Sequence, residues 1–441
     1  MRPIRTRFRP RFQTPGRLPS AELLRLPGRV RRERLGNGLE LCVVENRQAP
    51  LATSALFYRA GTRDEPAGHG GIAHFLEHMM FKGSALYGPG EIDRRTQALG
   101  GTNNAFTSHD LTAYYFNFAA DRWTEALAIE ADRMSALTLD PAQVASERQV
   151  ILEEIGMYND EPWDALELEV QARLFPDHPY GKAVLGTREE LLATGAEELR
   201  AFHRAAYRPD NAVLVVAGEV GEEAREAVER TLGAIEPEGE RLPRQPSSPP
   251  AAWPAGLVRV ERRKGEVARL LLALPAPDAA HPDHPALRML TSLLASGRAS
   301  RFHRALVEEG QLCTWVSLDV PESLDAGQIH LAAEVVPGIE PARVEAEVMR
   351  LLAEAAAGEA PIEELERARQ ILLADWVFGH EKVHQQALSA GFALTLYDLD
   401  FLERHLAAAL DSGLERLAEV AARYFTPERS GVLGWSLPRG A

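Results

Sequence analysis

The chain has 441 residues, of which 45% are hydrophobic and 26% are charged, a composition typical of a folded globular protein. At roughly 150 residues per domain, this length predicts two or three domains. The formal net charge of −15 argues against a nucleic-acid binder, because such proteins present basic surfaces to phosphates. No long run of uncharged apolar residues occurs, so we expect no membrane span. The two cysteines, Cys42 and Cys313, cannot supply a disulfide framework, so any metal must be held by histidines and carboxylates.

Residues 1–28 open with the stretch MRPIRTRFRPRF, which is rich in arginine and contains no acidic residue. A secretory signal has an apolar segment after its basic start, and none follows here. Pro3 and Pro10 disfavour the amphipathic helix of an organelle presequence. We therefore expect residues 1–28 to form a disordered basic tail. Abundant alanine and scarce lysine are typical of GC-rich bacterial coding, and we expect a cytoplasmic bacterial protein.

The stretch 237–256 contains six prolines among polar and small residues. This composition predicts a linker between two domains, residues 29–236 and residues 257–441. In the first part, residues 38–46 and 51–60 predict paired strands that lead to a helix at about 71–82, and residues 211–220 predict a closing strand. In the second part, residues 256–263 and 267–276 predict two strands, a helix begins near His284, and residues 430–437 predict the closing strand.

The repeated order of elements indicates a diverged internal duplication. The predicted fold class is α+β. It comprises two similar α/β sandwich domains, each with a mostly antiparallel sheet and helices packed on one face, joined by the proline-rich linker.

Residues 74–78, HFLEH, have the pattern H-x-x-E-H. On a helix, positions i and i+4 share a face, so His74 and His78 can direct both imidazoles at one metal ion. Glu77 lies next to that face and could take a proton from a water at the metal. The flanking residues are uncharged, which is consistent with a buried helix. For either histidine taken singly, an ordinary core or surface role is the alternative.

A catalytic zinc usually has three protein ligands and a water, so this motif needs one more ligand. Asp140 and Pro141 predict the start of a helix in which Glu147 and Glu154 lie seven residues apart on one face. Such a pair suits one metal ligand and one partner for a ligand histidine. A solvated acidic face is the alternative.

A second segment, HEKVH from His380 to His384, has the forward zincin pattern, with Glu403 as a candidate third ligand 19 residues downstream. Lys382 would place a cation beside the metal, and the glutamines that follow are polar. We therefore interpret this segment as a partly solvated helix rather than a metal site.

HFLEH, together with GGTNNAFTSHDLTAYYF at 100–116 and ERQVILEEI at 147–155, resembles the inverzincin metallopeptidases of the pitrilysin family, M16. The similarity is greatest to the half-length branch that includes mitochondrial processing peptidase and bacterial zinc-protease subunits. It covers about residues 32–424 and is more specific in the first half.

The resemblance implies that His74, His78 and Glu154 hold one Zn²⁺ ion per chain. It also implies that Glu77 is the general base and that Glu147 is an accessory glutamate behind a ligand histidine. The implied activity is zinc-dependent hydrolysis of peptide bonds in short or unfolded polypeptides, with Glu77 activating a water at the zinc.

The segment from Gly100 to Phe106 predicts a turn followed by a strand, because glycines and short polar residues precede an alternating pattern. If that strand lies at a sheet edge, an extended substrate can pair with it through main-chain hydrogen bonds. The resemblance assigns this role to Asn104 and Ala105, and we add Phe106 to the expected substrate-binding residues. An ordinary hairpin strand is the alternative.

Two positions in the second domain depart from the family pattern. Active members commonly carry an Arg and a Tyr in the C-terminal-type domain that stabilise the oxyanion. Val307 and Thr314 occupy these positions here, and valine has no donor while the threonine hydroxyl is too short. We therefore expect a heterodimer with a homologous non-catalytic chain that supplies the pair, with a homodimer as the second choice. The alternative function is that of a non-hydrolytic interaction or core subunit of a larger complex.

Overall fold

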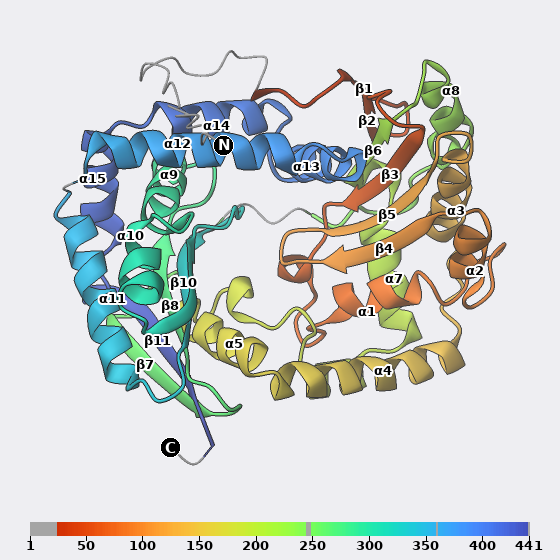
Figure 1. Ribbon diagram of the computed structural model, residues 1–441. Coiled ribbons are helices and arrows are strands. Elements are labelled where there is room, and N and C mark those ends of the chain that lie inside the picture. The colour runs from red at the N-terminus through yellow and green to blue at the C-terminus, as the bar shows by residue number, and fades with distance from the viewer. Residues whose placement is uncertain (1–23, 244–247, 359, 440–441) are drawn as a thin grey trace, which may run out of the picture.

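The computed structural model describes residues 24–243, 248–358 and 360–439, which form two sheet-centred halves side by side (Figure 1). The expected basic tail falls mostly on residues 1–23, which lie outside the described residues. The described part of the expected linker, residues 237–243 and 248–255, contains neither helix nor strand. Within the described residues, every helix is too short or too polar to span a membrane.

The first half is built on a six-stranded sheet with the spatial order β1-β2-β6-β3-β5-β4. Its strands are β1 (Arg29–Arg34), β2 (Glu40–Glu45), β3 (Leu51–Tyr58), β4 (Thr102–Thr107), β5 (Thr112–Ala119) and β6 (Ala212–Gly218). Neighbouring strands run antiparallel except β2 and β6, which are parallel. Since β4 pairs with β5 alone, it is an edge strand, which is the placement that substrate pairing would need.

The second half repeats this arrangement in a five-stranded sheet with the order β7-β11-β8-β10-β9. Its strands are β7 (Gly256–Arg263), β8 (Arg269–Ala276), β9 (Cys313–Asp319), β10 (Gly327–Val335) and β11 (Ser430–Leu437). Here too a single pair, β7 and β11, is parallel. The last strand of the first half, β6, lies between β2 and β3, and the last strand of the second half, β11, lies between β7 and β8, so the two sheets have the same topology apart from β1.

This topology corrects the expectation that residues 38–46 and 51–60 form paired strands. Both segments are strands, but β6 lies between β2 and β3 and hydrogen-bonds to each. In the second half, β11 separates β7 from β8 in the same way. Alternating apolar residues identify a strand but not its neighbour, because any strand with a matching buried face can occupy the adjacent position.

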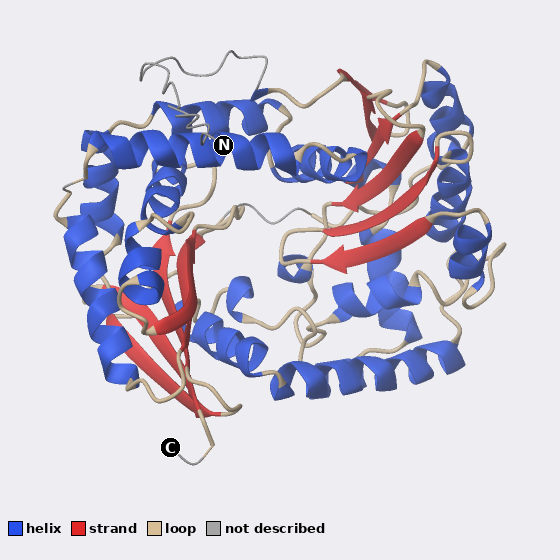
Figure 2. Cartoon of the chain, in the orientation of Figure 1, coloured by secondary structure: helices blue, strands red, loops and turns tan. Residues whose placement is uncertain are grey.

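Helices make up most of the remaining chain (Figure 2). In the first half they are α1 (Ile72–Met79), α2 (Glu91–Ala98), α3 (Thr124–Ser135), α4 (Pro141–Asp160), α5 (Pro162–Leu174), α6 (Arg188–Ala193), α7 (Ala196–Ala206) and α8 (Glu223–Arg230). In the second half they are α9 (His284–Ala295), α10 (Arg301–His303), α11 (Pro341–Ala356), α12 (Ile362–Gly379), α13 (Val383–Leu396), α14 (Asp400–Asp411) and α15 (Leu414–Tyr424). Helices α1, α3, α7 and α8 pack on one face of the first sheet, and α9, α11, α12 and α15 pack on one face of the second.

The opposite face of each sheet is covered by a helix from the other half. In Figure 1 the blue α13 reaches across to the first sheet, and the yellow α5 lies against the second sheet. Ala390 of α13 shares a buried cluster with Phe57 of β3, and Val170 of α5 shares one with Leu271 of β8. Both faces of the central strands β3, β6, β8 and β11 are therefore buried, and neither half has a complete core without the other.

The packing of α5 and α13 on the sheet of the other half depends on two breaks in long helices. The chain turns at Glu161, which precedes Pro162 and adopts an extended conformation (φ −75°, ψ 126°) that ends α4 and starts α5. The corresponding break lies between α12 and α13, where Lys382 is extended (ψ 137°). Each break lets the following helix cross to the other sheet.

The contact between α13 and the first sheet leaves no room for a larger side chain at Gly391. A Cβ atom there would lie 1.9 Å from the ring of Phe57, which is fully buried. We expect Gly391→Ala to lower the free energy of unfolding by about 1–3 kcal/mol, because the ring cannot move aside without disturbing the core. Thermal unfolding followed by circular dichroism measures this.

Gly379→Ala is the matched control, since a Cβ at that helical position has no neighbour within 4 Å. It should leave the unfolding midpoint unchanged or raise it slightly. Equal midpoints for the two variants would contradict the described docking of α13.

Candidate metal centre

The first two candidate ligands lie on α1, as the spacing predicted. The rings of His74 and His78 have centroids 4.6 Å apart, while Phe75 and Leu76 are fully buried in the core of the first half. The helix begins after Gly71, whose left-handed backbone (φ 86°) suits glycine, and it has no side-chain cap of its own. The carboxylate of Glu65 instead accepts hydrogen bonds from the backbone N–H groups of Gly71 and Ala73, both at 3.0 Å. The helix that carries the ligands is therefore fixed at its start.

The third candidate ligand comes from α4, which packs against α1. Asp140 caps α4 by accepting hydrogen bonds from two backbone N–H groups, as the sequence predicted. Oε2 of Glu154 lies 3.6 Å from Nε2 of His78 and 3.9 Å from Nε2 of His74. Within the described residues, these three form the one cluster of histidine, cysteine and carboxylate side chains whose ligand atoms all lie within 4.8 Å of one another.

This spacing fits a zinc ion. Three tetrahedral ligands at about 2.1 Å from an ion are separated by roughly 3.4 Å, so only small side-chain movements are needed. Burial, with a smaller effect from the neighbouring His78, lowers the pKa of His74 to about 3 before any metal charge is counted. A neutral imidazole has a lone pair to donate, and the donor set of two histidines and one glutamate is one that catalytic zinc sites use.

Glu147 lies behind His78 on the same face of α4 as Glu154. Its Oε1 accepts from Nδ1 of His78 at 2.9 Å, and its Oε2 contacts Nζ of Lys82 at 2.7 Å. Burial opposes ionisation of Glu147, but these two partners lower its pKa below the usual value. Because Nδ1 of His78 is bonded to Glu147, Nε2 is the ring nitrogen that faces Glu154 and is placed to bind a metal ion.

Glu77 lies on α1 between the two histidines and lines the same cavity. Burial raises its pKa, and the hydroxyl of Thr107 opposes this by donating to Oε2 of Glu77 at 2.5 Å. A carboxylate with a raised pKa that is held by one hydrogen bond is suited to accept and return a proton.

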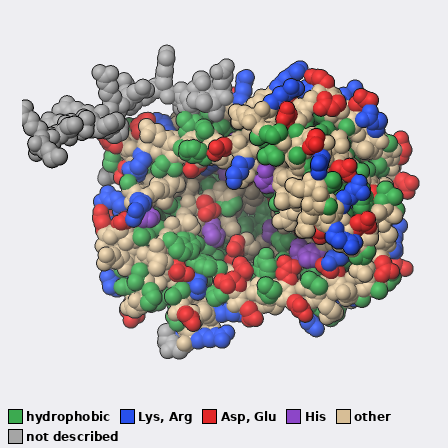
Figure 3. Space-filling view, turned by 45° about the vertical axis from the view of Figure 1, so that its right-hand side comes forward, with side chains coloured by type: hydrophobic (Ala, Val, Ile, Leu, Met, Phe, Trp, Pro, Cys, Tyr) green, Lys and Arg blue, Asp and Glu red, His purple; other side chains and the backbone are tan. Residues whose placement is uncertain are grey.

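The site opens into a cavity of about 780 Å³. Ala105, Phe106 and Thr107 of the edge strand β4 line it together with the metal-site residues. Asn104 lies on the same strand but outside this lining, and its side chain accepts from the backbone N–H of Ala105 at 2.9 Å. Figure 3 shows the molecule hollowed between its halves, with hydrophobic, acidic and histidine side chains inside the hollow.

Within the residues that the structure describes, the HEKVH segment does not belong to a cluster of three metal-ligating side chains. His380 ends α12 while His384 lies in α13, so the two histidines do not share one helix, which corrects the expectation of a continuous solvated helix. Both ring nitrogens of His380 are occupied, by the backbone carbonyl of Trp376 at 2.7 Å and the hydroxyl of Ser389 at 2.9 Å. Glu403 is paired with Arg25 instead.

The two positions expected for an Arg and a Tyr lie outside the lining of the metal-site cavity. Val307 packs against the core of the second half. Thr314 lies on the edge strand β9, where its hydroxyl donates to the backbone and side-chain oxygens of Glu334 at 3.3 and 3.2 Å.

Sequence reasoning missed three residues at the site. Lys82 pairs with Glu147, Thr107 bonds to Glu77, and His109 lines the cavity while its Nδ1 contacts the hydroxyl of Thr62 at 2.7 Å. Lys82 lies beyond the end of α1 at Met79, so its position depends on the loop that follows the helix. Thr107 and His109 had no local signal either, because their positions depend on where β4 lies relative to α1.

Two histidines and one glutamate that converge from an H-x-x-E-H helix and a neighbouring helix are the ligand set expected of an inverted zincin. The family model "Insulinase (Peptidase family M16)" matches residues 41–188, and "Peptidase M16 inactive domain" matches residues 195–372. An uncharacterized zinc protease of Mycobacterium leprae is 32% identical over 315 residues, which are 70% of this chain and 70% of that protein. The chain therefore belongs to peptidase family M16.

Other relatives agree with this assignment. The zinc protease PqqE of Helicobacter pylori is 26% identical over 401 residues, or 90% of each chain. The crystal structure of a protease from Helicobacter pylori superposes with a TM-score of 0.86 at 25% identity, covering 93% of this chain and 100% of that one. The periplasmic protease PqqL from Escherichia coli has the same fold in 48% of its length, with a TM-score of 0.76 at 16% identity.

The cluster predicts one metal site per chain. Elemental analysis of the purified protein should find about one zinc, and His78→Ala or Glu154→Gln should lose most of it, because two ligands hold zinc far more weakly than three.

His384→Ala is the matched control and should keep its zinc. Zinc that persists in His78→Ala but disappears in His384→Ala would refute the assignment.

Proposed function

We propose that this chain is the zinc-carrying subunit of an endopeptidase that hydrolyses short or unfolded polypeptides. The observation that carries this proposal is the convergence of His74, His78 and Glu154 beside Glu77, in a cavity bordered by the edge strand β4. The names of the relatives agree with a zinc-dependent protease.

In this proposal, His74, His78 and Glu154 hold the zinc ion. When bound, zinc polarises the scissile carbonyl and lowers the pKa of a water molecule. Glu77 accepts the proton of the attacking water and returns it to the leaving amine. Glu147 keeps the ring of His78 in the orientation that points Nε2 at the ion.

The edge of β4 is the proposed binding site for the substrate backbone. An extended peptide can add to the free side of the strand through main-chain hydrogen bonds at Asn104, Ala105 and Phe106. Main-chain pairing tolerates many side chains but requires an extended segment, which favours unfolded substrates over folded ones. The cavity of about 780 Å³ has room for a few residues of such a peptide.

The proposal includes a homologous partner chain. Val307 cannot donate a hydrogen bond, and Thr314 already donates to Glu334, so neither is placed to stabilise an oxyanion. A partner that carries the Arg and Tyr would supply this function in a heterodimer, and a homodimer is the second choice. PqqL matches this fold in 48% of its length and its solved first half matches it as well, which is consistent with a chamber that needs two such units.

Glu77→Gln tests the proposal directly. It removes the proton acceptor while keeping the shape of the side chain, so hydrolysis of an unstructured fluorogenic peptide should fall by about 10²–10⁴-fold. Zinc content should stay near one per chain, since Glu77 is not a ligand. Hydrolysis by Glu77→Gln at the wild-type rate would overturn the role of Glu77.

The same assay separates the partner hypotheses. We expect slow cleavage by the chain alone and faster cleavage after addition of a homologous M16 chain that carries the Arg and Tyr and lacks H-x-x-E-H. Full activity of the chain alone would refute the heterodimer. Zinc binding without hydrolysis under either condition would favour the non-hydrolytic interaction subunit.

A further inference from the structure

A buried polar cluster joins the two halves next to the metal-site cavity. We call it the interdomain clasp. In the first half the clasp consists of Arg63, Asp110, His178 and Tyr180. In the second half it consists of Leu324 and Asp325, from the loop before β10, and it also includes Ser248 from the segment before β7. Arg63, His178, Tyr180 and Asp325 are all less than 9% exposed.

Tyr180 is at the centre of the clasp. Its hydroxyl donates to the carboxylate of Asp110, with oxygen distances of 2.7 and 2.8 Å. The same hydroxyl accepts from the backbone N–H groups of Leu324 at 3.2 Å and Asp325 at 3.1 Å. One phenol oxygen therefore connects a side chain of the first half to the backbone of the second.

Ion pairs surround this hydroxyl. Arg63 lies 3.0 Å from Asp325 and 3.5 Å from Asp110. Nδ1 of His178 accepts from the backbone N–H of Tyr180 at 3.2 Å, and its Nε2 lies 3.0 Å from the carbonyl oxygen of Ser248 and 3.4 Å from Asp325. The backbone N–H of Ser248 also donates to Asp325 at 3.2 Å. Separating the halves would leave buried charges without partners, which is costly, so the clasp favours one relative position of the halves.

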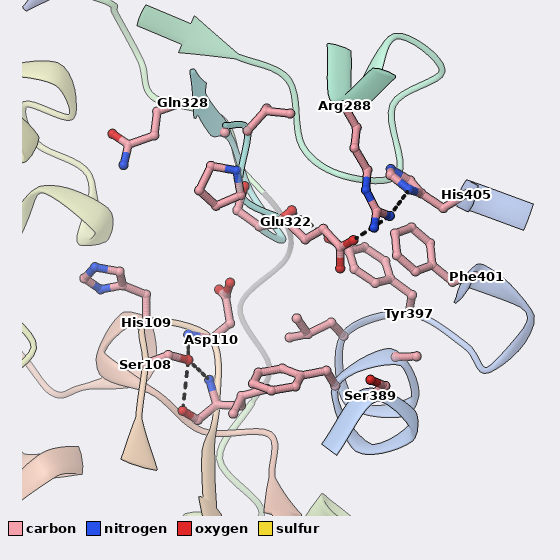
Figure 4. Close-up of a pocket in the computed structure, with 18 of the residues that line it drawn as sticks. Ser108, His109, Asp110, Arg288, Glu322, Gln328, Ser389, Tyr397, Phe401 and His405 are labelled. Atoms are coloured by element: carbon pink, nitrogen blue, oxygen red, sulfur yellow. Dashed lines mark hydrogen bonds and ion pairs between the residues drawn. The ribbon is translucent and has the colours of Figure 1, made fainter. Parts of the chain in front are cut away.

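The clasp is continuous with the edge strand. Asp110 lies three residues after Thr107, the last residue of β4. The loop between them is held by backbone hydrogen bonds from Thr62 to Ser108 at 3.1 Å and from Arg63 to His109 at 3.0 Å. Figure 4 shows Ser108, His109 and Asp110 on one wall of the neighbouring cavity and Glu322, which lies in the same loop as Leu324 and Asp325, on the wall opposite.

The end of strand β4 contacts the candidate general base, Glu77. Since β4 has a neighbour on one side only, its position near Thr107 depends on what holds the following loop. Thr107 donates the 2.5 Å hydrogen bond to Glu77. A covalent and hydrogen-bonded route therefore runs from the second half through Tyr180, Asp110 and β4 to Glu77.

We propose that Tyr180 is a positioning residue that couples the contact between the halves to the placement of β4 and, through Thr107, of Glu77. The expected effect of Tyr180 on catalysis rests on the proposed function. The coupling itself is a structural property that can be measured without turnover. The contact between the two halves then aligns the substrate-binding edge and the base together.

Tyr180→Phe removes only the hydroxyl and leaves the ring in place. In the zinc-loaded full chain, we expect amide hydrogen exchange in residues 102–111 to become several-fold faster, with zinc still near one per chain. In the peptide assay, kcat should fall roughly tenfold and KM should rise. The homologous M16 chain is added to this assay if the wild-type chain requires it for hydrolysis. Thr107→Val should lower kcat with little change in KM, and Thr107→Ser should restore it.

The double variant of Tyr180→Phe and Thr107→Val gives the decisive comparison. Because Tyr180 acts on Glu77 through Thr107, kcat of the double variant should be no lower than that of Thr107→Val alone. Tyr424→Phe is the matched control, since its hydroxyl also donates to a carboxylate, Asp283 at 2.8 Å, but within the second half. It should change neither the exchange nor the kinetics.

Unchanged exchange in Tyr180→Phe, or fully additive losses of kcat, would overturn the inference. If Tyr180→Phe does not fold, Asp110→Asn tests the clasp as a whole, since it weakens the bonds to the Tyr180 hydroxyl and to Leu324 and the pairing with Arg63 with little change in shape. If the wild-type chain hydrolyses nothing, the proposed function fails, and the exchange measurement still decides whether Tyr180 couples the halves to β4.

Discussion

The packing of α4 against α1 is the contact on which the metal centre depends. Helix α1 alone presents two histidines and the candidate base, which is one ligand short of a catalytic site. Glu154 and Glu147 both reach α1 because they are seven residues apart and face the same way. In the proposed site one glutamate completes the ligand set and the other orients His78, so a single helix–helix contact would supply both parts.

That contact is stabilised by the way the two halves are joined. Helix α4 continues into α5, which packs on the second sheet, while α13 of the second half packs on the first. The connections that form the site are therefore also those that hold the halves together. Glu167 and Gln171 of α5 line both neighbouring cavities, so a helix from the first half forms part of the wall shared between them.

The local arrangement of the site residues was predictable because it is encoded in spacing along helices. His74, His78, Glu147 and Glu154 follow helical periodicity, and Asp140 with Pro141 marked the start of α4. The alternation after Gly101 predicted β4, which the structure places at a sheet edge. Each of these signals lies within a single helix or strand, so it can be recognised without knowledge of the whole fold.

Features that join distant segments were not predictable in the same way. The insertion of β6 between β2 and β3, the exchange of α5 and α13, and the hydrogen bond from Thr107 to Glu77 each depend on which surfaces meet in space. The break at His380 was hidden for a related reason. Its helical spacing looked continuous, but the buried side chain bonds to Trp376 and Ser389 where α12 ends.

The central claim is that the two histidines of α1 and Glu154 of α4 hold a zinc ion next to Glu77. X-ray diffraction from zinc-loaded crystals, recorded on both sides of the zinc absorption edge, tests it most directly. The account predicts one strong anomalous peak per chain, at about 2.1 Å from a nitrogen of His74, a nitrogen of His78 and an oxygen of Glu154. A peak at His380 or His384 instead, or none at α1 with zinc in excess, would contradict the account.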